Sequence, residues 1–186
     1  FTPGILRTIV QPEHMKKIQV LHERYLKHTK VVVGKVSEVA KNYVKVKEKK
    51  INFEYLVISS GSSYSVPFKV QSVVLASRAE ILRKHHDNLR NAKKVLIIGG
   101  GLVGTELAGE IIWKYGDTKE ITIINASPRL IERNSHKAIS YVNEFLKNHG
   151  VKIFNSESVT KIQGLTCTTN KKNKFKADMI FLCKGI

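Results

Sequence analysis

The fold is decided by one stretch of the sequence, Val95-Leu96-Ile97-Ile98-Gly99-Gly100-Gly101-Leu102-Val103-Gly104-Thr105-Glu106-Leu107-Ala108-Gly109-Glu110. Four apolar residues, typical of a buried strand, lead directly into three glycines with the spacing Gly-x-Gly-x-x-Gly. Beyond these glycines, Val103, Leu107 and Ile111 recur at the spacing of one helix face. The stretch therefore predicts a strand, a tight turn and a helix in direct succession.

Each glycine of the motif has a steric role in such a unit. Gly99 makes the tight turn, Gly101 lets the main chain approach a pyrophosphate, and Gly104 lets the helix touch the strand. The first amides of the helix and its positive dipole end favour bound phosphates. A tight turn without a ligand is the alternative. We predict a dinucleotide-binding site whose contacting residues are Gly99, Gly100, Gly101, Leu102, Val103 and Gly104.

The flanking sequence continues the alternation of strands and helices. We expect strands at 94–98, 121–125 and 151–154, helices at 102–115 and 135–149, and further strands near 159–163, 165–169 and 179–183. The basic run at 171–176 is interpreted as a hairpin or loop. Alternation of this kind implies right-handed crossovers and a parallel sheet. The predicted fold class is α/β, with a Rossmann-like parallel sheet that binds NAD(P)H.

The first half of the chain has a different pattern. Its expected elements are a short helical or extended piece around 15–26, a three-stranded meander near 31–36, 43–47 and 53–58, and a charged helix at 77–94. The third strand of the meander is continuously apolar, so we expect it to be buried. We place the domain boundary after residue 89, which gives domains at 1–89 and 90–186.

Charge and composition limit the class of protein. The chain has 32 Lys and Arg against 15 Asp and Glu, a net charge of +17, and 42% of its residues are apolar. This composition excludes collagen-like and disordered classes. The excess charge favours polyanions, namely nucleotide phosphates, anionic lipids or nucleic acid. Because the lysines are scattered, we interpret most of them as solvated surface.

Several patterns are missing from the sequence. Cys167 and Cys183 lie 16 residues apart, which argues against a disulfide scaffold, a zinc ribbon and a local dithiol centre. The seven histidines have no metal-site spacing, so we expect no metal, and we place them on the surface or at caps. No apolar run approaches the ~20 residues of a membrane-spanning helix. We expect a soluble cytoplasmic protein, with peripheral attachment to a membrane or to mitochondria as the alternative.

The residue at the end of the second strand bears on which dinucleotide binds. NAD sites place Asp or Glu about 20 residues beyond the glycines, where it binds the adenosine ribose. Here Asn125 lies 21 residues after Gly104. An amide can bind a hydroxyl without repelling a phosphate, and Arg129 or Arg133 could pair with that phosphate. The choice between NADH and NADPH therefore stays open, as does the alternative that Arg129 is a solvated loop residue.

Glu106 also has two interpretations. The sequence places it in the first turn of the helix that faces the phosphates, where a carboxylate stabilises the helix dipole by roughly 0.3–1 kcal/mol. The second interpretation is a carboxylate beside the reacting rings of the cofactors. The sequence alone favours the first.

Three motifs together resemble one superfamily. Besides the glycine stretch, they are Tyr55-Leu56-Val57-Ile58-Ser59-Ser60-Gly61-Ser62 at the end of the meander and Ala177-Asp178-Met179-Ile180-Phe181-Leu182-Cys183-Lys184-Gly185-Ile186 as a return strand, where Lys184 replaces the usual Thr. The sequence is similar to the FAD-dependent pyridine nucleotide-disulfide oxidoreductases. Within them it resembles the branch of apoptosis-inducing-factor homologues and ferroptosis suppressor proteins, near the type II NADH dehydrogenases.

This resemblance implies a flavin oxidoreductase with two cofactors. NAD(P)H would give a hydride to FAD, and the reduced flavin would pass electrons to a quinone-type acceptor. Ser60, Gly61 and Gly185 would lie near the FAD, and Glu106 would lie beside flavin and nicotinamide as the catalytic residue. The meander would be the remnant of an FAD-binding dinucleotide fold.

The resemblance also implies that these 186 residues hold only part of the two cofactor sites. The family's first FAD motif and its C-terminal flavin motif are missing from these 186 residues. We expect the chain by itself to hold a complete NAD(P)H half-site but only the rim of the FAD site, and neither to retain flavin tightly nor to turn over. The alternative function is a basic non-enzymatic module on an anionic membrane or, less favoured because aromatic residues are sparse, on nucleic acid.

Overall fold

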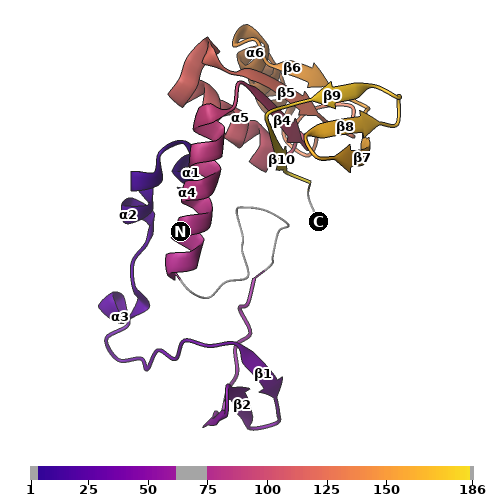
Figure 1. Cartoon of the computed structure of the whole chain (residues 1–186). Coiled ribbons are helices and arrows are strands. Elements are labelled where there is room, and N and C mark those ends of the chain that lie inside the picture. The colour runs from indigo at the N-terminus through magenta and orange to yellow at the C-terminus, as the bar shows by residue number, and fades with distance from the viewer. Residues whose placement is uncertain (1–3, 62–74, 185–186) are drawn as a thin grey trace.

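Three sheets organise the chain in the computed structural model, which describes residues 4–61 and 75–184. Their strands are β1 Val36–Val39, β2 Tyr43–Val46, β3 Lys49–Asn52, β4 Lys94–Ile98, β5 Glu120–Ile124, β6 Lys152–Phe154, β7 Val159–Gln163, β8 Thr166–Thr169, β9 Lys174–Lys176 and β10 Met179–Leu182. The order β10-β4-β5-β6 forms a parallel sheet, while β1-β2-β3 and β7-β8-β9 are antiparallel (Figure 1). The predicted α/β class is therefore confirmed.

Long helices follow the parallel strands, and short ones begin the chain. Their bounds are α1 Arg7–Val10, η2 Pro12–His14, α2 Met15–Ile18, α3 His22–Tyr25, α4 Leu75–Asn91, α5 Leu102–Tyr115, η3 Gly116–Thr118 and α6 His136–Asn148. Ser135 caps α6, where its side chain accepts a hydrogen bond from the main-chain N–H of Ala138. Within the described part, no helix has both the length and the apolar character that a bilayer crossing requires.

The central strand β4 shows why the parallel sheet is buried on both faces. Successive side chains of a strand point to opposite faces of the sheet. Val95 and Ile97 belong to an apolar core shared with α5 and α6, whereas Leu96 and Ile98 belong to a second core. A continuously apolar strand is what two covered faces require.

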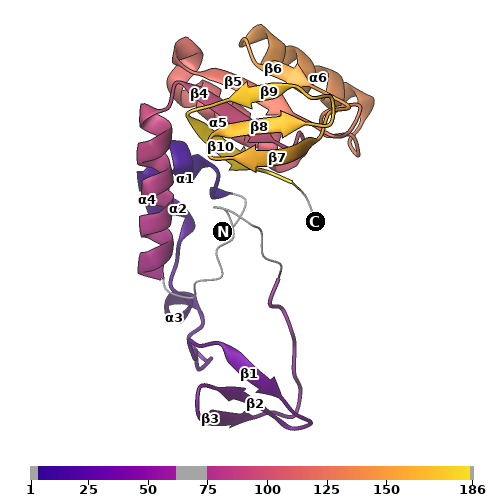
Figure 2. The same cartoon turned by 45° about the vertical axis from the view of Figure 1, so that its right-hand side comes forward.

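The second core lies under the antiparallel sheet β7-β8-β9. Cys167 of β8 and Ala177 are buried there with Leu96 and Ile98. Figure 2 shows this sheet stacked over the parallel sheet. The basic run at 171–176 forms the turn into β9 and β9 itself, so the hairpin interpretation is confirmed.

The start of the chain packs onto the first core. Ile9 and Val10 of α1 are fully buried, and α1 lies against α4, whose Leu82 and Leu89 are buried in the same cluster (Figure 1). The sequence predicted no helix at 7–10, because four residues are too short to show periodicity. The domain division after residue 89 stays a prediction.

The predicted position of the third strand of the meander is wrong. A two-residue turn at Lys47 and Glu48 pairs Val46 with Lys49, so the third strand is β3. The stretch 53–58 is not a strand, and Tyr55 and Val57 within it are 90% and 84% exposed. A buried strand needs pairing partners at its edges. Among the described residues no strand pairs with this stretch, whose one main-chain bond to the meander runs from the N–H of Phe53 to the carbonyl oxygen of Asn42.

Replacing Ile9 by alanine tests whether α1 shares the core of the parallel sheet. Ile9 is 0% exposed, so its loss should lower the free energy of unfolding by about 2–5 kcal/mol. Urea unfolding followed by circular dichroism measures this change. Leu21→Ala, at a side chain that is 50% exposed, is the control and should change stability by about 0.5 kcal/mol or less. If both substitutions lowered the free energy of unfolding by the same small amount, α1 would not be part of this core.

Candidate dinucleotide-binding site

The glycine turn follows β4 at the carboxyl edge of the parallel sheet. Gly99 has a φ of +116°, and a Cβ there would lie 2.5 Å from the carbonyl oxygen of Cys183. Its main-chain N–H donates to the carbonyl oxygen of Ile124 at 2.8 Å. The N–H of Cys183 donates to the carbonyl oxygen of Ile98, also at 2.8 Å. The turn is thus held between β5 and β10, in a conformation that glycine alone adopts readily.

Gly101 and Gly104 differ in what surrounds them. Gly101 is the N-cap of α5, and a Cβ added to it would meet nothing within 4 Å. A Cβ at Gly104 would collide with the carbonyl oxygen of Gly99. Gly104 therefore lets α5 approach the turn, whereas Gly101 keeps space free in front of it. This agrees with the roles that the motif predicts.

The first amides of α5 are available to a ligand. The N–H groups of Leu102, Val103 and Gly104 have no acceptor within the helix, because the first bond runs from Thr105 to the carbonyl of Gly101. Among the described residues no side chain caps this helix start. Amides of this kind at a positive dipole end bind phosphate groups.

Asn125 connects the glycine turn to the loop after β5. Its side chain is buried, and its Oδ1 accepts the N–H of Gly100 at 3.3 Å. Its Nδ2 donates to the carbonyl oxygens of Ser127 and Arg129, each at 3.0 Å, and to Oδ1 of Asn155 at 2.9 Å. The amide nitrogen is therefore committed to the protein. The predicted contact of Asn125 with a ribose hydroxyl stays a prediction, with only the second lone pair of Oδ1 left for it.

A cavity of about 540 Å³ opens beside the turn, within the usual range of about 300–1,000 Å³ for small-molecule sites. Five of the predicted contact residues line it: Gly99, Gly100, Gly101, Leu102 and Asn125. Val103 instead packs its side chain against the first core. Only the main-chain amide of Val103 remains for the predicted contact. The structure thus brings most of the motif to one cavity.

Charged side chains line the far wall of this cavity. They are Glu132, Arg133 and Lys184, whereas Arg129 is exposed outside the lining. Of the two arginines considered from the sequence, Arg133 is therefore the one that lines the cavity, and contact of Arg129 with the cofactor stays a prediction. Glu132 carried no sequence signal, and Lys184 had one only as the departure from the usual Thr. Burial raises the pKa of the Cys183 thiol in the same lining to about 12, so this thiol is uncharged at neutral pH.

Glu106 is the fifth residue of α5, just beyond the first turn in which the sequence interpretation placed it. The first turn of α5 has no acidic residue, so the dipole interpretation is wrong. Glu106 is an exposed residue outside the lining of the cavity, as far as the described residues define it. Desolvation, and secondly the charge of Glu110, raise the pKa of its carboxyl. Its catalytic role stays a prediction.

The structure shows little about the residues predicted to contact FAD. Ser60 and Gly61 are exposed, on a segment that contributes nothing to the cavity lining, and Gly61 has a φ of +67°. Gly185 lies outside the described residues. Contact of these three residues with flavin stays a prediction.

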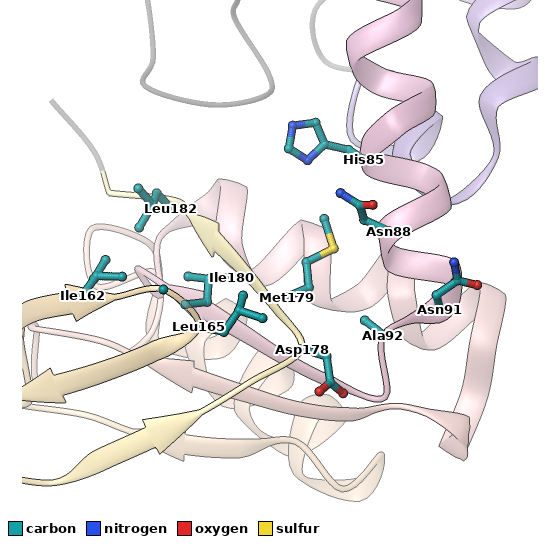
Figure 3. A pocket seen from close by; sticks show the side chains of 11 residues that line it. His85, Asn88, Asn91, Ala92, Ile162, Leu165, Asp178, Met179, Ile180 and Leu182 are labelled. Carbon is teal, nitrogen blue, oxygen red and sulfur yellow. The ribbon is translucent and has the colours of Figure 1, made fainter.

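A second cavity, of about 520 Å³, lies along β10 and holds none of the predicted site residues. Figure 3 shows His85 and Asn88 of α4 on one side of it, with Met179 and Leu182 of β10 among its other lining residues. The buried Nδ1 of His85 has no hydrogen-bond partner within the described part, and burial lowers the pKa of this ring, with Lys84 as a second cause. The sequence placed this histidine on the surface or at a cap.

The family model described as pyridine nucleotide-disulphide oxidoreductase matches residues 2–186. The chain belongs to this family. Pyridine nucleotide-disulphide oxidoreductases bind FAD and NAD(P)H, so both expected cofactors are confirmed for the family. The glycine turn and the open space at Gly101 fit the dinucleotide half of that pair.

Similar proteins support the same assignment. Apoptosis-inducing factor homolog A of Dictyostelium discoideum is 35% identical over 164 residues, which cover 83% of this chain and 40% of the relative. Ferroptosis suppressor protein 1 of Xenopus tropicalis is 27% identical over 149 residues, 73% of this chain and 39% of the relative. The predicted resemblance is confirmed. The chain spans about 40% of the length of these two curated relatives.

A solved oxidoreductase has the same fold. The ferredoxin reductase for the CYP199A2 system from Rhodopseudomonas palustris superimposes with a TM-score of 0.77 at 15% identity. The superposition covers 98% of this chain and 48% of that protein. The two proteins therefore share a fold.

Asn125→Ala tests the connection between the glycine turn and the loop after β5. It leaves the buried N–H of Gly100 and three partly buried acceptors without their partner, so we expect the free energy of unfolding to fall by about 1–3 kcal/mol. Affinity for NADH should fall with it, because the turn loses its support. Urea unfolding and NADH titration measure the two effects. Asn143→Ala, which removes only a bond to its own helix at Ile139, is the control. Unchanged stability and unchanged NADH affinity in Asn125→Ala would contradict the supporting role of Asn125.

Proposed function

We propose that the chain supplies the NAD(P)H-binding half of an FAD-dependent oxidoreductase that passes electrons to a quinone-type acceptor. The observation that carries the proposal is the open space at Gly101, in front of the free amides of α5 and inside a cavity of about 540 Å³. A diphosphate needs close main-chain approach of this kind. The quinone-type acceptor rests on the resemblance to the ferroptosis suppressor branch, with the match to one member at 27% identity as support.

The glycine turn, the charged rim of the cavity and Glu106 have different tasks in this function. The amides of Leu102, Val103 and Gly104 bind the diphosphate, and Gly101 admits it. Arg133 and Lys184 add positive charge at the rim, against one negative charge from Glu132. FAD, when bound, supplies the two-electron chemistry between nicotinamide and acceptor. Glu106 is proposed as the carboxylate on the nicotinamide side, where its raised pKa favours the protonated form more than in water.

Gly101→Val tests the proposed site. The added side chain fills the space that the diphosphate needs but meets no protein atom within 4 Å at its Cβ, so the fold should persist. We expect NADH affinity to fall at least tenfold in a fluorescence titration. Stability should fall by only about 1 kcal/mol, since valine is a poorer N-cap than glycine. Gly109→Val, also with an open Cβ position on α5, is the control and should leave binding unchanged.

Two results would count against the proposal. One is full NADH binding by the Gly101 variant, which would place the nucleotide elsewhere. The other is a purified full-length protein that is colourless and does not react with NADH or NADPH. The first result concerns the site in this chain, whereas the second concerns the oxidoreductase activity.

Arg133→Ala tests which residue recognises the extra phosphate of NADPH. Arg133 lines the cavity and has no ion-pair partner among the described residues. A charge-assisted bond contributes about 1.5–3 kcal/mol, so the variant should lose roughly tenfold or more in NADPH affinity while NADH affinity changes little. Arg129→Ala, outside the lining, should affect neither. Parallel titrations with both nucleotides measure the difference, and equal losses for both would assign Arg133 to the diphosphate.

A further inference from the structure

Four lysines surround a smaller cavity at the amino edge of the parallel sheet. The cavity has a volume of about 300 Å³ and lies between the parallel strands β4, β5 and β6 on one side and β9 on the other. The lysines come from three different strands: Lys94 from β4, Lys152 from β6, and Lys174 and Lys176 from β9. This group is called the lysine pocket below.

The positive charge of the lysine pocket is not neutralised by the protein. All four side chains are exposed, and among the described residues none has an acid within ion-pair distance. Glu120 is the acid in the lining, so the charges of the lining sum to +3. Asp178 lies close enough for Lys94 and Lys176 to contribute to its lowered pKa. Its Oδ2, however, accepts the main-chain N–H groups of Lys93 and Lys94 at 2.9 and 2.7 Å.

The floor of the lysine pocket is rigid and apolar. Phe154 and Phe175 meet there edge to face, with ring centroids 4.8 Å apart, and Leu96 and Ala177 are buried beneath. Because the floor joins two packed sheets, the lysines are attached to fixed strands rather than to a loop. Positive charges held around a concave floor favour a compact ligand, whereas an extended polyanion or a flat membrane surface suits a flat cationic face.

The lysine pocket is separate from the dinucleotide site. It lies at the amino ends of β4 and β5, and the glycine turn lies at their carboxyl ends. The two linings share no residue, although they meet at β6, where the carbonyl oxygen of Phe154 accepts the N–H of Asn125 at 2.9 Å. The dinucleotide site therefore does not account for this charge.

We propose that the lysine pocket binds a compact anion that carries several phosphate groups. Its source is either a free phosphorylated small molecule or the phosphorylated headgroup of a lipid. Several phosphates are required because single contacts between exposed charges contribute little in water. Cations on three sides of one concave site let a multivalent anion contact several of them together.

Tripolyphosphate is the first probe, titrated calorimetrically into the chain at low and at 0.15 M salt. We expect binding that weakens with salt and is lost at least tenfold in Lys152→Glu/Lys174→Glu. The matched control is Lys171→Glu/Lys172→Glu, which makes the same charge change on the β8–β9 turn outside the lining and should change affinity much less. Glu120→Gln removes the one acid of the lining and should tighten binding.

Vesicles identify the source of the phosphate groups. Neutral vesicles with a few per cent of phosphoinositide should capture the protein, with the same lysine dependence, if a lipid headgroup is the ligand. Binding of tripolyphosphate without vesicle capture would assign a free small molecule.

Equal losses in the two double variants would overturn the proposal, because they would reflect net charge alone. Displacement of tripolyphosphate by NADH would also overturn it, by placing the anion at the glycine turn. NADH affinity of the double variants should be unchanged, which keeps this test independent of the proposed function.

Discussion

The missing side chain of Gly104 is the constraint on which the fold and the site both depend. A Cβ there would collide with the carbonyl oxygen of Gly99, so glycine alone lets α5 begin so close to the end of β4. That approach brings the unpaired amides of the helix start to the edge of the parallel sheet. It also lets Gly99 stay bonded to β5 through Ile124. The same contact therefore determines how the helix packs on the sheet and where a diphosphate can bind.

Asn125 shows how one residue type can change a site without changing its fold. An acid at the end of the second strand would direct its charge to a ribose. The amide of Asn125 can donate as well as accept, and it uses both abilities on the protein, from Gly100 to Asn155. The charged side chains of this cavity that follow Asn125 along the loop are Glu132 and Arg133, which have opposite charges.

The sequence predicted best where one rule sufficed. The glycine spacing and the apolar runs located β4, α5 and the parallel strands, because close packing leaves few alternatives there. Burial of the stretch around Tyr55 and Val57 was predicted wrongly, since apolar character alone does not supply a pairing strand. Helix α1 was missed because four residues show no periodicity. Arg133 and Lys184 could be named from the sequence, but only the folded loop shows that both line one cavity.

The positions of the charged residues also became clear only in the folded chain. A net charge of +17 spread over the sequence gives no site, yet the fold gathers lysines and arginines around two hollows at opposite ends of the same strands. The two hollows share no lining residue, and each has its own charged side chains: Glu132, Arg133 and Lys184 at one, and four lysines with Glu120 at the other. Each hollow can select its own anion, so the basic character of this chain does not need one common partner.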